Sequence, residues 1–106
     1  MRYLMLVCVD PSLEADATPE ETDAWVESAG SARLDGNALR SPREAVTVRV
    51  RRSERLDTDG PFAETKEFVA GFDILECESR EEALEIAAAH PVARFGAIEV
   101  REFWED

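Results

Sequence analysis

The apolar positions along the chain form two kinds of strand-like run. Residues 2–9 and 68–77 are almost continuously apolar, which is typical of strands covered on both faces. Residues 45–51 and 97–104 instead alternate apolar with polar side chains, as half-buried strands do. The pattern therefore predicts two central strands and two edge strands in one sheet.

Two segments between these runs carry the start signals of helices. The sequence TPEE at residues 18–21 offers a threonine N-cap, a proline in the first turn and a glutamate that closes a capping box. An apolar stripe that includes Trp25 follows, and predicts a helix that stops before Gly36. The sequence SREE at residues 79–82 repeats the device, and predicts an alanine-rich helix over 83–89.

The resulting order is strand, helix, strand, strand, helix, strand, in which residues 53–57 can add a short hairpin arm after the second strand. Right-handed crossovers then give a ferredoxin-like α+β fold, βαββαβ, with an antiparallel sheet of spatial order 4-1-3-2 and both helices on one face. The first strand is apolar on its other face as well. We expect a second copy of the chain to cover that face, which makes the protein a homodimer.

Length and charge limit the class of protein. The 106 residues form one domain, 1–106, and 24 acidic against 12 basic residues give a net charge of −12. Such a surface repels nucleic acid and anionic membranes, so neither is an expected partner. The opening apolar run is too short for a secretion signal or a membrane span. We expect a cytoplasmic protein.

The two cysteines, Cys8 and Cys77, lie in apolar runs without the spacing of a metal site. We expect both to be free thiols, because the predicted strand order places them too far apart for a disulfide. No metal and no cofactor is expected, because the chain lacks His/Cys metal spacing and a glycine-rich phosphate loop.

The predicted topology gathers four candidate catalytic positions at one sheet edge: Asp10, Asp23, Asp59 and His90. An imidazole near acids and at a helix C-terminus favours its charged form, which suits acid/base chemistry or anion binding. Each residue also has a structural interpretation. His90 can end the apolar stripe and cap helix carbonyls, and Asp59 can bond amides of its own turn.

Further candidates are assigned to ligand binding: Gly60, Pro61, Phe62, Glu64, Lys66, Glu67 and Arg101. Lys66 is the only lysine and is flanked by acids, which is compatible with a site or with a solvated charge cluster. We expect Arg101 on the sheet face together with Arg49 and Arg51. It can pair with Glu99 across the dimer or receive an anionic ligand.

The segment DGPFAETKE at residues 59–67 resembles the DGPF motif of the YCII-related (YciI-like) family. The apolar first strand, the helix around Trp25, the His-Pro after the second helix and the closing G-x-x-E-x-R at residues 96–101 extend the resemblance over nearly the whole chain. It implies a dimeric α+β barrel with a ferredoxin-like protomer. Some members resemble neighbours or fusions of extracytoplasmic-function sigma factors, which implies a regulatory context and a sigma-factor-related partner.

Simpler members of the family are proposed to use a histidine on the first helix and an aspartate just before the proline that follows the second. This sequence departs from that pattern, because His90 stands before Pro91 while Thr22 and Asp23 occupy the helix position. If the resemblance carries a dyad here, the dyad is reversed.

Two functions of different classes follow. The first is a small cofactor-free enzyme that acts on an organic molecule in a cleft between the DGPF turn and the end of the second helix. The second is a non-catalytic regulatory or partner-binding module. A pH profile of ligand binding distinguishes them, because an acid/base histidine must titrate near neutrality.

Overall fold

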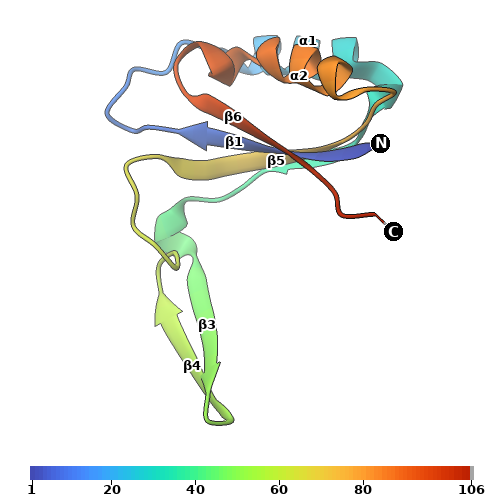
Figure 1. Ribbon diagram of the computed structural model, residues 1–106. Helices are drawn as coiled ribbons and strands as arrows, with labels where there is room; N and C mark the ends of the chain where they lie inside the picture. The colour runs from blue at the N-terminus through green and yellow to red at the C-terminus, as the bar shows by residue number, and fades with distance from the viewer. Residues whose placement is uncertain (106) are drawn as a thin grey trace.

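The computed structural model describes residues 1–105 as a sheet with two helices on one face and a hairpin that projects from the other side (Figure 1). The strands are β1 (Arg2–Val9), β2 (Arg33–Ala38), β3 (Val46–Arg51), β4 (Glu54–Asp59), β5 (Phe68–Glu76) and β6 (Ala97–Glu102). The helices are α1 (Pro19–Ala29) and α2 (Arg80–Ala88), with 3-10 turns η1 (Gly30–Ala32), η2 (Pro42–Glu44) and η3 (Pro91–Arg94).

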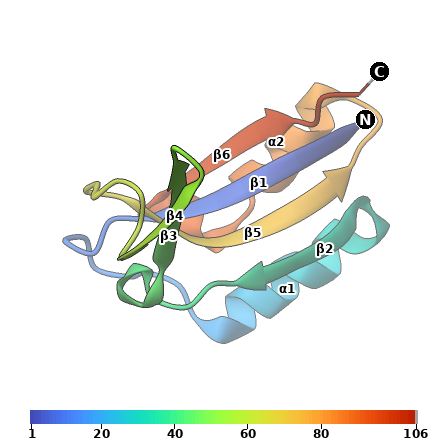
Figure 2. The same cartoon turned by 90° about the horizontal axis from the view of Figure 1, so that it is seen from below.

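The four-stranded sheet has the order β2-β5-β1-β6, and every pairing is antiparallel (Figure 2). β1 and β5 are central and β6 lies at an edge, so the ferredoxin-like order is confirmed. The chain passes through a bulge where β1 shifts register against β5 between Val7 and Cys8, beside Gly71. At Gly71 an added Cβ would lie 3.1 Å from the carbonyl oxygen of Asn37, because the two backbones approach closely there.

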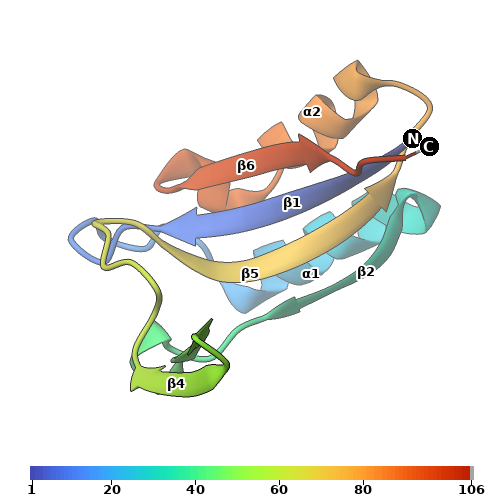
Figure 3. The same cartoon turned by 60° about the horizontal axis from the view of Figure 1, so that its bottom comes forward.

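The predicted second strand is wrong in position. The sheet edge is β2, whereas the strand predicted over residues 45–51 corresponds to β3, which pairs with β4 in a separate two-stranded sheet (Figure 3). β2 lacks clear alternation because Gly36 has no side chain, and the space beside it is filled by Asp73 of β5 and by Arg33 of β2 itself. The first helix also ends earlier than predicted. Its last residue is Ala29, and Gly30, which follows it, has a φ of +56°.

Both helix starts were predicted correctly. The Thr18 hydroxyl accepts from the Glu21 amide at 3.2 Å, and the Glu21 carboxylate accepts from the Thr18 amide at 3.3 Å, which completes the capping box. The Ser79 hydroxyl accepts from the Glu82 amide at 3.1 Å. The Glu82 carboxylate accepts from the Glu78 amide, so this second cap differs from a full capping box.

The core lies between the sheet and the helices. It consists of buried side chains from β1, β5 and both helices, including Tyr3, Met5, Trp25 and Leu75. The alternate residues of the central strands form the opposite surface, which no helix covers (Figure 1). There the half-buried pairs Leu4–Ile74 and Leu6–Phe72 stand side by side across β1 and β5. We call this surface the open face.

The hairpin β3–β4, residues 46–59, is called the arm. The last bond between the main sheet and the segment that leads to the arm runs from the Leu39 amide to the Ala70 carbonyl, at 2.8 Å. At the base of the arm, the Gly60 amide donates to the Ala45 carbonyl at 2.7 Å. Its turn holds Arg52 and Ser53 at positive φ. The radius of gyration, 15.7 Å, exceeds the ~13 Å of a compact domain of this length, because the arm extends away.

Both cysteines are free, as predicted. Cys8 lies near one end of β1, and Cys77 follows the opposite end of β5, where its amide bonds the Met1 carbonyl. Among residues 1–105, no helix has the length and apolar character needed to cross a membrane.

Candidate functional site

A cavity of about 250 Å³ lies beneath α1, against β2, β5 and η3. Its walls are largely apolar and include Trp25, Val26 and Val92. Its polar lining residues are Thr22, Arg33, Asn37, Asp73 and His90. We call this cavity the His90 pocket.

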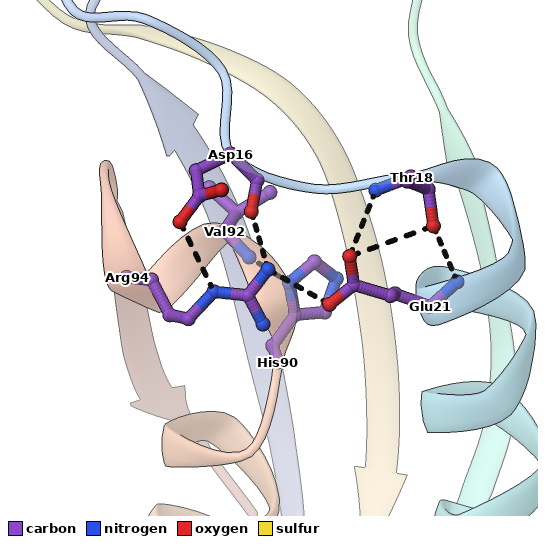
Figure 4. A network of polar contacts seen from close by, with 6 residues as sticks. All are labelled: Asp16, Thr18, Glu21, His90, Val92 and Arg94. Atoms are coloured by element: carbon purple, nitrogen blue, oxygen red, sulfur yellow. Dashed lines mark hydrogen bonds and ion pairs between the residues drawn. The ribbon is translucent and has the colours of Figure 1, made fainter.

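His90 is buried and caps η3. Its Nδ1 accepts the amide hydrogen of Val92 at 3.1 Å (Figure 4). The neutral imidazole therefore carries its proton on Nε2. Trp25 packs edge to face against the ring and is itself fixed to α2 by a bond of 2.9 Å from Nε1 to the Ile86 carbonyl. The imidazole is thus held in one orientation.

Burial lowers the pKa of His90, and the nearby charge of Asp73 offsets only part of that effect. The expected preference for the charged imidazole is therefore wrong. The cost of removing the charged form from water outweighs the attraction of the neighbouring acid. At neutral pH His90 is a neutral hydrogen-bond donor.

Asp73 is the second buried titratable group of the pocket. Its Oδ1 accepts from Arg33 Nε at 2.8 Å. Burial raises the pKa of Asp73, whereas the bond and the charge of Arg33 oppose this rise. Gly36 makes room for the pair, since a Cβ at that position would meet both side chains and would lie 2.8 Å from the Phe72 carbonyl.

Asp73 and Arg33 were absent from the predicted site. The available signal was Asp73 itself, the single charge within the apolar run of β5. A charge placed there needs a partner. Arg33 carries no comparable signal, because the residues of its strand do not alternate clearly between apolar and polar.

Asp10 lies buried at the end of β1. Its carboxylate accepts from the amide and the hydroxyl of Ser12, at 2.9 Å and 2.7 Å, and these bonds lower the pKa of Asp10. Lys66 Nζ lies 3.5 Å from its other oxygen. Asp10 therefore connects the loop at residues 60–67 to the sheet.

None of the three acids predicted to be catalytic, Asp10, Asp23 and Asp59, lines the His90 pocket. Asp23 is exposed on α1, and its neighbour Thr22 lines the His90 pocket instead. Asp59 is exposed at the end of β4, opposite Val46. The expectation that all four positions meet at one edge assumed that Asp59 follows a strand of the main sheet, whereas it follows a strand of the arm.

Most of the predicted ligand-binding residues line a second, larger cavity of about 910 Å³ at the base of the arm. It lies between residues 39–45 and the loop that follows β4, and it includes Gly60, Pro61, Phe62, Glu64 and Glu67. It has no lining residue in common with the His90 pocket. The structure thus separates the predicted single cleft into two cavities.

Arg101 lies outside both cavities. It is exposed on β6, and its Nε is 3.5 Å from Glu99 of the same strand. Arg49 and Arg51, expected on the same sheet face, belong to the arm.

Arg94 connects η3 to the start of α1, two elements that line the His90 pocket. Its guanidinium donates to the Glu21 carboxylate at 2.8 Å and to the Asp16 carbonyl, and so links η3 to the capping box of α1 (Figure 4). Among residues 1–105, no group of three or more His, Cys, Asp and Glu side chains has metal-binding geometry.

Comparison with known proteins gives three findings. The family model described as the YCII-related domain matches residues 1–105. An uncharacterized protein of Rhizobium meliloti (strain 1021) is 49% identical over 43 residues, which are 41% of this chain and 35% of that protein. The chain thus spans about a third of that relative's length.

The third finding is a solved structure. The 5-chloro-2-hydroxyhydroquinone dehydrochlorinase TftG of Burkholderia phenoliruptrix AC1100, in complex with 2,5-dihydroxybenzoquinone, is 15% identical. The comparison covers 100% of this chain and 96% of that one, with a TM-score of 0.49. A likeness at this level does not bear on chemistry.

Proposed function

This chain belongs to the YCII-related domain family, and we propose that its His90 pocket binds a small carbonyl-bearing organic molecule and transfers a proton within it. One observation carries the proposal. A buried histidine with a lowered pKa and a buried aspartate with a raised pKa line the same cavity. Titratable groups whose environments displace their pKa values in this way are typical of acid/base sites.

The two groups have different roles in this proposal. Among residues 1–105, no protein group hydrogen-bonds His90 Nε2, so its proton is left for a bound carbonyl oxygen. Asp73 Oδ1 is held by Arg33, and Oδ2 is the oxygen that takes a proton from the carbon beside that carbonyl. The raised pKa makes Asp73 a stronger base than an exposed aspartate. Arg33 is a positioning residue.

The cavity sets the size of the ligand. A volume of 250 Å³ holds roughly eight water molecules at ~30 Å³ each, so the ligand has a comparably small number of non-hydrogen atoms. The apolar walls favour a compact molecule with one or two polar groups.

We propose further that the protein is a cytoplasmic homodimer. Two free cysteines support the compartment, because disulfides form mainly in oxidising environments. The half-buried apolar strip of the open face supports the dimer, because a second copy offers the same strip for stacking.

Hydrogen–deuterium exchange at carbon tests the activity. A panel of small ketones and 2-keto acids is incubated in D2O with the protein, and NMR follows the loss of the signal from the proton beside the carbonyl. We expect exchange above the buffer rate for at least one compound, abolished by Asp73→Asn and reduced by His90→Gln. Glu85→Gln, an exposed position on α2 that lines neither cavity, is the matched control and should exchange at the parent rate.

Native mass spectrometry of the purified protein complements this test. The native spectrum can show a small molecule that co-purifies with the parent and is absent from His90→Gln. If no compound of its chemical class undergoes exchange with the parent, this result favours the non-catalytic module. If the parent protein shows no bound small molecule and also no exchange, the proposed function is contradicted.

A further inference from the structure

The arm makes no sheet contact outside itself among the described residues 1–105. β3 pairs only with β4, and all six residues of β4 are exposed. An isolated two-stranded hairpin is marginal in water. The turn adds to the cost, since Arg52 and Ser53 both have positive φ, which non-glycine residues rarely adopt. A stable arm therefore needs contacts from outside the protomer.

One side of the arm offers such a contact. Val46, Val48 and Val50 form a row along β3, and each is 58–59% exposed. β4 places the ion pair between Arg55 and Asp57 on the same side, at 2.7 Å. An apolar row with charges along its border is the composition of an interface rather than of a solvated strand.

Charge is divided unevenly between the arm and the rest of the chain, which we call the body. The arm, residues 46–59, has four arginines against one glutamate and two aspartates, a formal charge of +1. The body carries the remaining −13. Two bodies of this charge repel each other, whereas an arm with a small positive charge packs against the partner's body without adding to that repulsion.

The direction and the length of the arm fit this arrangement. It projects on the side of the open face, away from the helices (Figure 1). Six residues at ~3.3 Å each extend about 20 Å, whereas stacked sheets lie ~10 Å apart. An arm of this length passes beyond the plane of a sheet stacked on the open face and reaches the flank of that second copy.

We propose that the arm clasps a second copy of this chain, with the row Val46, Val48 and Val50 packed against the partner's body. The inference rests on the homodimer proposed above and adds the segment that holds it together. Because the relation is two-fold, each copy clasps the other and two arms contribute to every dimer.

Sedimentation equilibrium of three variants tests this proposal. Val46→Ser/Val48→Ser/Val50→Ser removes the apolar row. A second variant replaces residues 46–59 by a short glycine linker, which the bonded pair Ala45 and Gly60 allows. Leu56→Ser, on the opposite side of the same hairpin, is the matched control. We expect the dimer dissociation constant to rise at least tenfold in the first two variants and to stay within twofold in the control.

The outcomes separate the two proposals. A parent chain that is monomeric at 100 µM contradicts the dimer and the arm together. A parent dimer whose affinity is unchanged in both the serine variant and the arm deletion contradicts the arm alone. A labelled single-stranded RNA is the remaining probe. If it binds the parent tightly through the arginines while neither arm variant weakens the dimer, the arm serves a polyanion instead.

Discussion

The rings of Trp25 and His90 meet edge to face, with centroids 4.6 Å apart and planes inclined by 64°. A protonated imidazole quenches an adjacent indole, so the fluorescence of Trp25 should report the charge of His90. The other tryptophan, Trp104, is 95% exposed and is removed by Trp104→Phe. In that background we expect emission to fall on acidification with a midpoint below pH 6.5, because burial lowers the pKa of His90. A midpoint above 6.5, or the same titration in His90→Gln, would contradict the neutral histidine.

Stability should depend on pH through the same residue. Between the unfolded pKa of about 6.5 and the lower folded pKa, the unfolded chain binds a proton that the folded chain does not. The free energy of unfolding therefore falls as pH drops from 7.5 to 5.5 through this window. Urea unfolding at one protein concentration measures it. His90→Gln should lose most of this dependence, and an equally steep variant would disprove the assignment.

Arg33→Met should destabilise the fold by about 3 kcal/mol, because it leaves the buried carboxylate of Asp73 without its partner. The deficit should shrink at acid pH, where Asp73 takes up a proton. Arg33→Met/Asp73→Asn is the control, since it removes the unpaired charge and should recover much of the loss. Chemical denaturation at pH 8 and pH 4.5 gives both comparisons. A deficit that is the same at both pH values would mean that Arg33 acts through packing alone.

Lys66 provides a test of the contact with Asp10. It is the only lysine, so an endoproteinase specific for lysine makes one cut, after residue 66. Because the Lys66 side chain is 78% exposed, the pair is worth less than about 1 kcal/mol. Asp10→Asn should accelerate the cut by no more than about fivefold. Glu14→Gln, an exposed acid of the neighbouring loop, should cut at the parent rate. Equal rates in all three proteins would show that the pair does not restrain the loop.

The sequence predicted the parts of the fold that depend on local chemistry. The Thr18 and Ser79 caps, and the two central strands, follow from side chains that act on their own backbone or from continuous apolar runs. β2 could not be found in this way. Gly36 stands where the Arg33–Asp73 pair fills the space, so the residue pattern of β2 depends on Asp73 of another strand as well as on its own residues. The alternating valines of β3 indicated a strand correctly, but not which sheet contains it.

The candidate site shows the same limit. His90 was found because it is the only histidine and precedes a proline, yet its charge state depends on Trp25 and on burial, which no local pattern contains. Asp73 was visible as a charge in an apolar run, and its meaning depended on a partner 40 positions away. Contacts between residues far apart in the sequence, rather than residue type, determine which acid lines the pocket with His90.

The hydrogen bond from Leu39 to Ala70 is where pairing with the main sheet ends, and the chain then continues into the arm. The arm's ladder joins residues close in sequence, so it can form and open by itself, whereas β1 pairs with residues of β5 that lie 59 to 74 positions away in the sequence. Amide hydrogen exchange of the free protomer should therefore fall into two tiers. Amides of residues 46–59 exchange through local opening, and those of β1 and β5 exchange only when the whole domain unfolds. In this respect the arm is expected to unfold as a separate cooperative unit, independently of the main sheet.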